Sequence, residues 1–355
     1  MKVLFTARYS LFSQPGGDTQ QVVQTADALR VLGVEVDIIL HGEIIDFTKY
    51  DLVHFFNFGR PADILGVLPQ LKVPLIVSAI WVDYSEYDKY RPGFGSTLQK
   101  ILGPNRLEYF KTIARGFNGS DKMPGLLYIS KGHSRALKTV AFRASAMITS
   151  SQSEKQRITK SFEDAKNVHV IPLGLSIQFS TPFKEETERS GVICVGRIEG
   201  LKNQLNLIRA AKGADWHLKV IGKTALNQPK YYAQCEAEAT ENVEFVGWQN
   251  MEHLLESYRS AKVLVLPSFF ETFGLVALEA MSQGCNVVIA DRPDMKSIFN
   301  QNVLRCNPHD PNDIRQKIEQ ALELPVYKLN DAQRATYNWP AIAKQLQSIY
   351  KNTLS

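Results

Sequence analysis

The sequence predicts an α/β protein with two doubly wound, Rossmann-like domains. Short apolar segments of the buried-strand kind alternate with longer segments of helical period along the whole chain, which is typical of βα units. A stretch near residues 173–188 contains Pro182, serines and charges but has no clear period, so we expect the domain boundary there. The chain has 355 residues, of which 44% are hydrophobic, and this is ample for two cores of ordinary size.

The expected strands are short and rich in branched apolar residues. In the first half they are Val3–Thr6, Val34–Leu40, Leu52–Phe55, Leu75–Ser78, Ala146–Thr149 and Val168–Ile171. In the second half they are Val192–Val195, Leu218–Ile221, Val243–Val246, Val263–Leu266 and Asn286–Ile289. Their order predicts a first domain over residues 1–175, a second over residues 176–337, and a last helix over residues 338–352 whose first turn tolerates Pro340.

A strand, a turn and a helix are predicted to follow one another between residues 263 and 284. The apolar run Val263–Leu266 indicates a buried parallel strand, and apolar residues recur at helical spacing from Leu275 onward. The turn contains Gly274, which has no side chain to keep an anion away from the helix. Because the first turn of a helix has unpaired N–H groups and a partial positive charge, the segment predicts a site for a diphosphate.

Two carboxylates lie eight residues apart in this segment. Glu271 precedes the helix, where it can accept hydrogen bonds from sugar hydroxyls, and Glu279 is expected about two turns along the helix, within reach of a ribose diol. One carboxylate would then bind each end of a nucleotide sugar. The alternative is that Glu279 is a solvated helix residue and Glu271 only a favourable charge near the helix dipole, and this pair alone does not decide between the two interpretations.

A second unit of strand, turn and helix, Gly191–Ala210, places two cations at the carboxyl end of a strand. Arg197 follows the Gly196 turn, and Lys202 opens the helix. Ligands bind at this edge in open α/β sheets. At an effective dielectric of about 20 and a separation of about 4 Å, each cation would interact with a phosphate charge by about 4 kcal/mol. The alternative is an ordinary surface arginine and lysine.

The two motifs, in this order, resemble the retaining glycosyltransferases of family 4, whose GT-B fold has two Rossmann-like domains and an interdomain cleft. The resemblance covers nearly all of the second half, including residues 168–179, 218–223, 242–248 and 256–268, but the first half only in outline. In the first half, Gly16 and Gly17 resemble the amino-terminal glycine loop of the family. The resemblance also implies that the helix over residues 338–352 packs on the first, acceptor-binding domain.

The resemblance implies a role for each motif residue. Arg197 and Lys202 match the basic pair that contacts the donor diphosphate and stabilises the leaving group, and Glu271 matches the residue that holds the donor sugar. These three would be the catalytic residues. Glu279 matches the residue that binds ribose. The other implied site residues are the turns around the donor and the acceptor or phosphate loop, namely Gly196, Phe273, Gly274, Leu275, Gly16 and Gly17.

Several positions depart from the family pattern. Thr272 and Asn203 stand where glycine is frequent, and Leu173 stands where asparagine is often found. More seriously, many members have a histidine shortly after the fourth strand, and this chain has none. Trp81 or Asp83 would line the acceptor side instead, and we assign neither a catalytic role.

The function implied by the resemblance is the transfer of a sugar from a nucleotide-diphosphate sugar to a glycan or lipid-linked acceptor, with retention and without a metal or other cofactor. Cell-surface polysaccharide biosynthesis is the implied setting. A catalytically inactive nucleotide-sugar-binding protein is the alternative. A Rossmann dehydrogenase is disfavoured because ARYSLFSQPGG replaces a Gly-x-Gly-x-x-Gly turn after the first strand.

The composition is compatible with a cytoplasmic enzyme. The four cysteines are widely spaced, which predicts a reducing compartment and no zinc site. No apolar run approaches the roughly 18 residues that a membrane-spanning helix needs, and we expect no signal peptide because the first strand begins directly after Met1. His54, His133 and His169 are each isolated in the sequence, so we interpret them as structural or surface residues.

Residues 89–160 are strongly basic. They contain 14 lysines and arginines against three acidic residues, whereas the whole chain has a net charge of +5. Leu107, Phe110, Ile113 and Phe117 repeat near helical spacing beside basic residues, the pattern of a helix that lies on an anionic membrane. The alternative is an apolar stripe that faces the core below a solvated basic face. The first hypothesis is a peripheral contact with the inner membrane surface; nucleic acid is a weaker partner because no recognised binding module is present.

Overall fold

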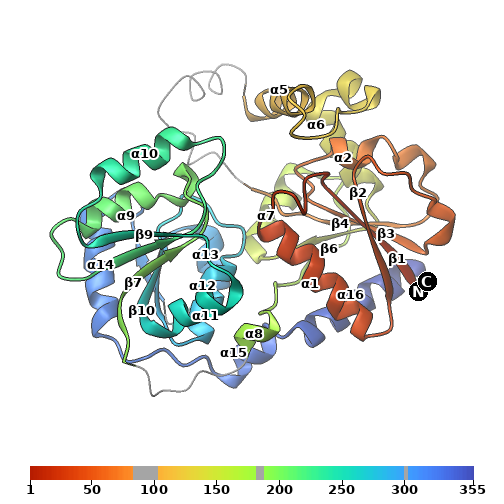
Figure 1. Ribbon diagram of the computed structural model, residues 1–355. Coiled ribbons are helices and arrows are strands. Elements are labelled where there is room, and N and C mark those ends of the chain that lie inside the picture. The colour runs from red at the N-terminus through yellow and green to blue at the C-terminus, as the bar shows by residue number, and fades with distance from the viewer. Residues whose placement is uncertain (83–102, 181–187, 300–302) are drawn as a thin grey trace. The chain divides into compact units, whose positions relative to one another are not determined.

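The computed structural model describes residues 1–82, 103–180, 188–299 and 303–355 (Figure 1). The chain divides into two compact units. The first contains Met1–Val82, the described residues up to Gly174, and Thr336–Ser355, and the second contains the described residues of Leu175–Ala335. Each unit is built around a parallel sheet whose described strands number six. The expectation of two Rossmann-like α/β domains is therefore confirmed.

The sheet of the first unit has the strand order β2-β1-β3-β4-β5-β6. Its central strands are buried because helices cover both faces, and this is why their sequences are continuous apolar runs. The strands are β1 Lys2–Ala7, β2 Glu35–Leu40, β3 Leu52–Phe56, β4 Leu75–Ser78, β5 Ala146–Thr149 and β6 Val168–Val170. The helices are α1 Gly17–Val31, η1 Phe47–Lys49, α2 Ala62–Leu65, η2 Leu68–Gln70, α5 Pro104–Phe117, α6 Leu126–Arg143, α7 Gln152–Ser161 and α16 Trp339–Leu354.

The C-terminal helix α16 packs in the core of the first unit, beside α1. Its Tyr350 hydroxyl lies 2.5 Å from Nδ1 of the buried His54, and Nε2 of that histidine lies 2.9 Å from the Ser78 hydroxyl. Burial lowers the pKa of His54 to about 3, so the ring is neutral and structural. At the other end of α16, the Trp339 ring lies so close to Gly174 that a Cβ there would be 2.7 Å from Cδ2 of the ring.

The sheet of the second unit has the strand order β12-β11-β10-β7-β8-β9. Its strands are β7 Ser190–Val195, β8 Leu218–Ile221, β9 Val243–Gly247, β10 Ala261–Leu266, β11 Asn286–Ala290 and β12 Leu304–Cys306. Its helices are α8 Ile177–Ser180, η3 Gly200–Lys202, α9 Gln204–Ala211, α10 Pro229–Glu238, α11 Met251–Ser260, α12 Leu275–Ser282, α13 Pro293–Ile298, α14 Pro311–Glu323 and α15 Asp331–Thr336. All eleven expected strands are present, whereas β12 was missed because three residues with a central Arg305 carry no readable period.

Within the described residues, no helix is both long enough and apolar enough to span a bilayer. The four cysteines are buried and free, and burial raises the pKa of each thiol to about 12. They are therefore small core residues rather than reactive thiols.

Candidate functional site

The two motif segments of the second unit meet at one edge of its sheet. Strands β7 and β10 are parallel neighbours, with Val263 opposite Val192 and Leu264 opposite Ile193. Their carboxyl ends therefore lie side by side. The turn that begins at Gly196 and the turn that begins at Pro267 leave the sheet at this common edge, which is the edge where ligands bind in open α/β sheets.

Lys202 and Glu271 form an ion pair at this edge. Nζ of Lys202 lies 2.6 Å from Oε1 of Glu271, and the two side chains are 23% and 12% exposed. The Ser268 hydroxyl donates a second hydrogen bond of 2.8 Å to the same carboxylate oxygen. The sequence predicted both charged residues, while the serine was missed. Both side chains still contact solvent. The ammonium can therefore leave the carboxylate and bind an anion, and the carboxylate can then accept hydrogen bonds from hydroxyl groups.

Asn203 fastens the lysine turn to its surroundings. Its φ of 60° lies in the left-handed region, which glycine favours and asparagine tolerates. Its side-chain amide donates to the carbonyl of Pro267 at 2.9 Å and to that of Pro308 at 2.6 Å. The asparagine at this position, where the family often has glycine, thus has a physical explanation. The asparagine keeps the backbone conformation and adds two hydrogen bonds to the end of β10 and to the loop after β12.

Arg197 is the more exposed of the two predicted cations. Its side chain is 62% exposed, and Nη2 lies 3.2 Å from Oε1 of Glu199. Its carbonyl accepts a hydrogen bond of 2.8 Å from the amide of the buried Gln204, which fixes the backbone while the guanidinium stays in solvent. The ion pair of Arg197 described in the structure is therefore with Glu199 and not with Glu271.

Gly222, which the sequence analysis did not single out, allows the ends of β7 and β8 to approach each other. Its φ is 149°, and a Cβ on it would lie 2.0 Å from the carbonyl oxygen of Gly196. No side chain can be accommodated there. Gly196 itself has a φ of 148°, with only Lys202 Cε near the position of a Cβ, at 3.9 Å.

Helix α12 begins where the sequence predicted. Gly274 caps it with a φ of 75°, and the N–H groups of Leu275 and Val276 open the first turn without a carbonyl four residues earlier in the helix. A Cβ would lie 3.3 Å from both Met295 Sδ and Phe299 Cε2, so the backbone conformation and the packing also require glycine here. The expected approach of an anion to this glycine stays a prediction. Phe273 is buried beside it.

Glu279 lies one turn after Leu275, and not two turns along the helix as expected. Its side chain is half-buried and accepts a hydrogen bond of 3.0 Å from the hydroxyl of Tyr258, a buried residue that the sequence did not single out. Burial raises the pKa of Glu279 to about 7, and the hydrogen bond from Tyr258 opposes that rise. The carboxylate is thus held in one orientation, unlike that of a solvated helix residue.

Comparison with known proteins shows which family the chain resembles. Residues 178–339 match the family model of the glycosyl transferases group 1. This part of the chain is similar to that family. The predicted resemblance to glycosyltransferases is therefore confirmed, while the narrower assignment to family 4 stays a prediction.

Relatives with glycosyltransferase names are similar over part of their length. An uncharacterized glycosyltransferase of Methanocaldococcus jannaschii is 27% identical over 236 residues, which are 59% of this chain and 60% of that protein. A D-inositol 3-phosphate glycosyltransferase of Corynebacterium glutamicum is 24% identical over 243 residues, 60% of this chain and 58% of that protein. The match spans about three-fifths of the length of these relatives.

Solved structures of glycosyltransferases share the fold. Sucrose-phosphate synthase from Thermosynechococcus elongatus superposes with a TM-score of 0.74 at 18% identity and covers 99% of this chain and 98% of its own. HepE of Anabaena, solved with UDP and glucose, gives a TM-score of 0.66 at 17% identity over 99% and 98% of the two chains. At these identities the likeness shows the GT-B fold alone.

A polar cavity of about 500 Å³ lies at the carboxyl ends of β11 and β12. Its charged lining residues are Asp291, Arg292, Arg305, Asp310 and Asp313. The cavity adjoins the lysine turn because Pro308, which also lines it, accepts the hydrogen bond from Asn203. Next to it, the ring of His309 lies 4.9 Å from that of Phe269. The sequence analysis missed this group because its members come from two separate loops without a motif.

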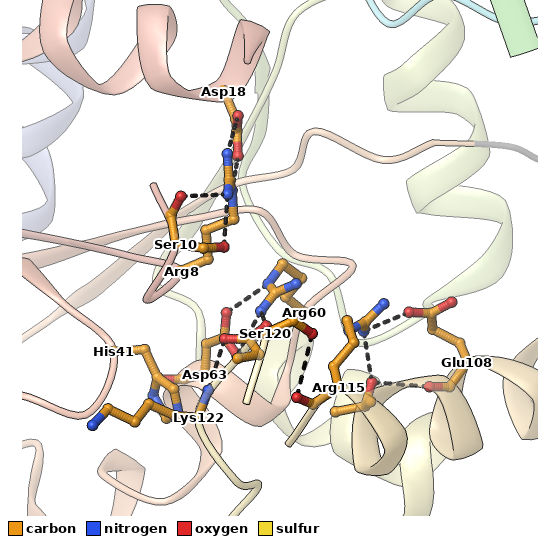
Figure 2. A network of polar contacts seen from close by, with 12 residues as sticks. Arg8, Ser10, Asp18, His41, Arg60, Asp63, Glu108, Arg115, Ser120 and Lys122 are labelled. Atoms are coloured by element: carbon orange, nitrogen blue, oxygen red, sulfur yellow. Dashed lines mark hydrogen bonds and ion pairs between the residues drawn. The ribbon is translucent and has the colours of Figure 1, made fainter. Parts of the chain in front are cut away.

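The glycine loop of the first unit is held by a residue that the sequence analysis did not identify. Gly16 precedes α1 in an extended conformation, and a Cβ on Gly17 would meet nothing within 4 Å. Arg8 at the end of β1 holds the loop (Figure 2): Nε lies 2.6 Å and Nη2 3.0 Å from the two carboxylate oxygens of Asp18, and Nη2 also donates to the carbonyl of Gln14. The sequence features that could have revealed this contact were an arginine directly after a strand and an aspartate in the first turn of the following helix.

Trp81, after β4, has its backbone fixed in place. Its N–H donates a hydrogen bond of 2.7 Å to the buried carboxylate of Glu154, and its half-buried ring lies 5.4 Å from that of Phe58. The preceding Ile80 has a φ of 44°, a strained conformation for a β-branched residue and one that concentrates at functional sites. Asp83, the other residue considered for the acceptor side, lies outside the described residues.

Proposed function

We propose that the chain is a glycosyltransferase that moves a sugar from a nucleotide-diphosphate sugar to a glycan or lipid-linked acceptor. The observation that carries this proposal is the Lys202–Glu271 pair, which stands at the common edge of β7 and β10 with Glu279 one turn inside α12. An ammonium, two carboxylates and a helix N-terminus are the groups that a diphosphate, a sugar and a ribose require. The match of residues 178–339 to the glycosyl transferases group 1 supports it.

In the proposed mechanism the donor diphosphate lies on the first turn of α12. Lys202 leaves Glu271 to contact the phosphate, Arg197 turns from Glu199 to the same group, and the freed Glu271 accepts hydrogen bonds from the sugar. When the acceptor hydroxyl attacks the anomeric carbon, the bond from that carbon to the phosphate oxygen breaks. Negative charge grows on the departing oxygen, which takes up the proton of the hydroxyl. Fixed cations and N–H dipoles stabilise that charge in the transition state more than in the ground state.

The proposed roles of the two glutamates differ from those of a glycosidase pair. A glycosidase needs two carboxyl groups that flank one glycosidic bond. The proposal places Glu271, which is paired with Lys202, at the sugar and Glu279, which accepts from Tyr258, at the ribose. We propose retention of the anomeric configuration, as in family 4, and name no covalent nucleophile. Neither metal nor another cofactor is part of the proposed reaction.

The proposal extends to the donor base, the acceptor and the cellular setting. Structures of Anabaena HepE contain UDP and UDP-glucose, so UDP-sugars are the first donors to test. Another structural neighbour is a lipopolysaccharide outer core galactosyltransferase, WaaB, with a TM-score of 0.62, and this fits a role in cell-surface polysaccharide biosynthesis. We propose that the first unit holds the acceptor, through residues that include Trp81 and the Gly16–Gly17 loop, and that the protein acts in the cytoplasm.

The first experiment is a thermal-shift survey with UDP, GDP, ADP, dTDP and their common sugars, in the absence of added metal. One nucleotide should raise the melting temperature by several degrees. Glu279→Ala should abolish the shift, whereas the exposed Glu244→Ala, in the same unit, should keep it. No shift with any of the nucleotides would contradict the donor site. Once a donor is found, the anomeric configuration of the transferred sugar, read by NMR, tests retention.

A nucleotide-sugar-binding protein without transfer activity is the second candidate. One observation favours it: in this structure Lys202 and Glu271 neutralise each other at 2.6 Å. A pair that did not open on donor binding would leave the phosphate without its cation. Tight donor binding with neither transfer nor slow donor hydrolysis would establish this second function.

A further inference from the structure

Helix α5 combines half-buried residues with strongly exposed ones. None of its 14 residues is buried, and Phe110 and Phe117 are 54% and 78% exposed. The two rings stand seven residues apart, on the face that also carries Arg106 and Ala114. Large aromatic side chains at helical spacing in solvent are unfavourable unless another apolar phase covers them.

The other two members of the predicted apolar stripe, Leu107 and Ile113, are half-buried. At about 100° per residue they lie on either flank of the face that carries Phe110 and Phe117. Helix α5 packs on α6. The Tyr109 ring stacks on that of Tyr128 at 5.6 Å, and its hydroxyl donates to the carbonyl of Ile129 at 2.9 Å. The four apolar residues therefore share one face of the helix, and that face is half-buried at its flanks and exposed in its middle.

The apolar surface continues into the connection between α5 and α6. A Cβ on Gly116 would lie 2.6 Å from Sδ of Met123, so this connection is packed against the end of α5 that carries Phe117. Figure 1 shows α5 and α6 side by side at one end of the first unit. The exposed apolar residues of this region, which we call the α5–α6 surface, are Phe110, Phe117, Met123, Leu126 and Ile129.

The charge around the α5–α6 surface is almost entirely positive. Residues 103–143 contain eight lysines and arginines but only two acidic residues, Glu108 and Asp121. Both acids are already paired. Glu108 accepts from Arg115 at 2.8 Å (Figure 2), and the buried Asp121 pairs with Arg60. Within the described part of this region, exposed cations such as Arg106 and Lys131 therefore keep their charge available for an anionic partner.

We propose that the α5–α6 surface docks on an anionic lipid bilayer. The apolar side chains would enter the boundary between headgroups and acyl chains, while the surrounding cations would contact lipid phosphates. Each lysine or arginine near such a surface contributes about a fivefold gain in partitioning. A nucleic acid would satisfy the cations but leave the aliphatic Met123, Leu126 and Ile129 uncovered, and for this reason lipid is favoured. The inference rests on these surface residues and stands independently of the proposed transferase activity.

The test is cosedimentation of the full chain with vesicles of phosphatidylcholine, with and without phosphatidylglycerol, at an ionic strength of about 0.15 M. Binding is expected only with phosphatidylglycerol. The double variant Phe110→Ser, Phe117→Ser should lower the partition coefficient at least tenfold. The matched control is Phe142→Ser, which changes another exposed phenylalanine, near the far end of α6, and should bind like the wild type.

A second pair of variants tests the charges. Arg106→Glu combined with Lys131→Glu should reduce binding at least tenfold, whereas Lys212→Glu combined with Lys230→Glu, which makes the same charge change on exposed residues of the second unit, should reduce it less than threefold. Melting curves establish that each variant is folded. The proposal is overturned if the wild type ignores both vesicles, if the two controls lose as much binding as the test variants, or if a DNA duplex of equal charge competes as well as the vesicles do.

Discussion

The carboxyl edges of the two sheets differ in how their groups are held. In the second unit, side chains from several loops brace one another, as when Asn203 joins Pro267 to Pro308, and the charged residues stand in sequence motifs. In the first unit the loops are held by Arg8 and Glu154, and Ile80 is strained. A diphosphate is common to all nucleotide-diphosphate sugars, and a ribose to most of them, so one arrangement serves them. Acceptors differ in chemistry, and an edge that binds them has no common pattern to match.

The largest expected effect comes from removing Lys202, the cation at the edge of the second unit. Lys202→Ala should lower turnover by about two to three decades, because the transition state loses a charge beside the departing phosphate. Lys223→Ala, at the end of the neighbouring strand β8, is the control and should keep most of the activity. Steady-state kinetics with saturating donor and melting curves of both variants measure this. A Lys202→Ala enzyme that keeps its turnover, or that simply fails to fold, would remove the basis for a catalytic role.

Replacing one glycine in each unit compares the effect of an added Cβ on the stability of the protein. Gly222→Ala should cost about 3 kcal/mol or more of unfolding free energy, because its Cβ would overlap the carbonyl of Gly196 and its φ is unfavourable for alanine. Gly17→Ala should change stability by only about 0.5 kcal/mol, since its Cβ meets nothing within 4 Å at the start of α1. Urea unfolding of the two variants measures both values. Equal losses would show that the close approach of β7 and β8 does not matter.

The carboxylate of Glu279 should make the stability of the protein depend on pH. Its pKa is about 7 in the folded protein against an ordinary value of 4.5, so the folded state binds a proton that the unfolded chain has released between these values. The contribution of this group to stability is present below about pH 4.5 and is lost as the pH rises to about 7. Relative to Glu279→Gln, the wild type should lose roughly 1–2 kcal/mol across this window. Urea unfolding at several pH values measures the difference, and parallel curves for the two proteins would contradict the assignment.

The smallest expected effect concerns the first unit. Trp81→Ala should lower transfer to an acceptor about tenfold, because an aromatic face is lost, and should leave the donor-induced thermal shift unchanged. Trp81→Phe should recover most of the activity. The informative result is a loss of transfer without a loss of donor binding. If donor binding falls together with transfer, the division of roles between the two units is wrong.

The sequence predicted the parts of the molecule that depend on local patterns. Eleven strands followed from apolar runs, and Lys202, Glu271 and Glu279 followed from motifs whose spacing a single strand, turn and helix can display. Tyr258 and Ser268 were missed because a hydrogen bond to a motif residue leaves no signature in the chain. The position of Glu279, one turn into α12 and not two, depended on where the turn at Gly274 ends, and helix boundaries are poorly specified by spacing alone.

The exposed half of α5 shows the opposite limit. A period near 3.6 placed its apolar residues on a helix, yet it did not show that Leu107 would be half-buried while Phe110 would be exposed. A contact that joins α5 to α6 is that of Tyr109 with Tyr128, which lies nineteen residues away in the sequence. Tertiary contacts of this kind decide between a core-facing stripe and a surface that can bind a partner.

The central claim is that the edge shared by β7 and β10 binds the donor. The most direct measurement is a crystal structure of the chain with the nucleotide sugar that stabilises it best. We expect the diphosphate at the first turn of α12, with Lys202 Nζ moved from Glu271 to a phosphate oxygen and with Glu279 accepting from the ribose. A nucleotide bound elsewhere, or bound here with the Lys202–Glu271 pair intact, would contradict the account.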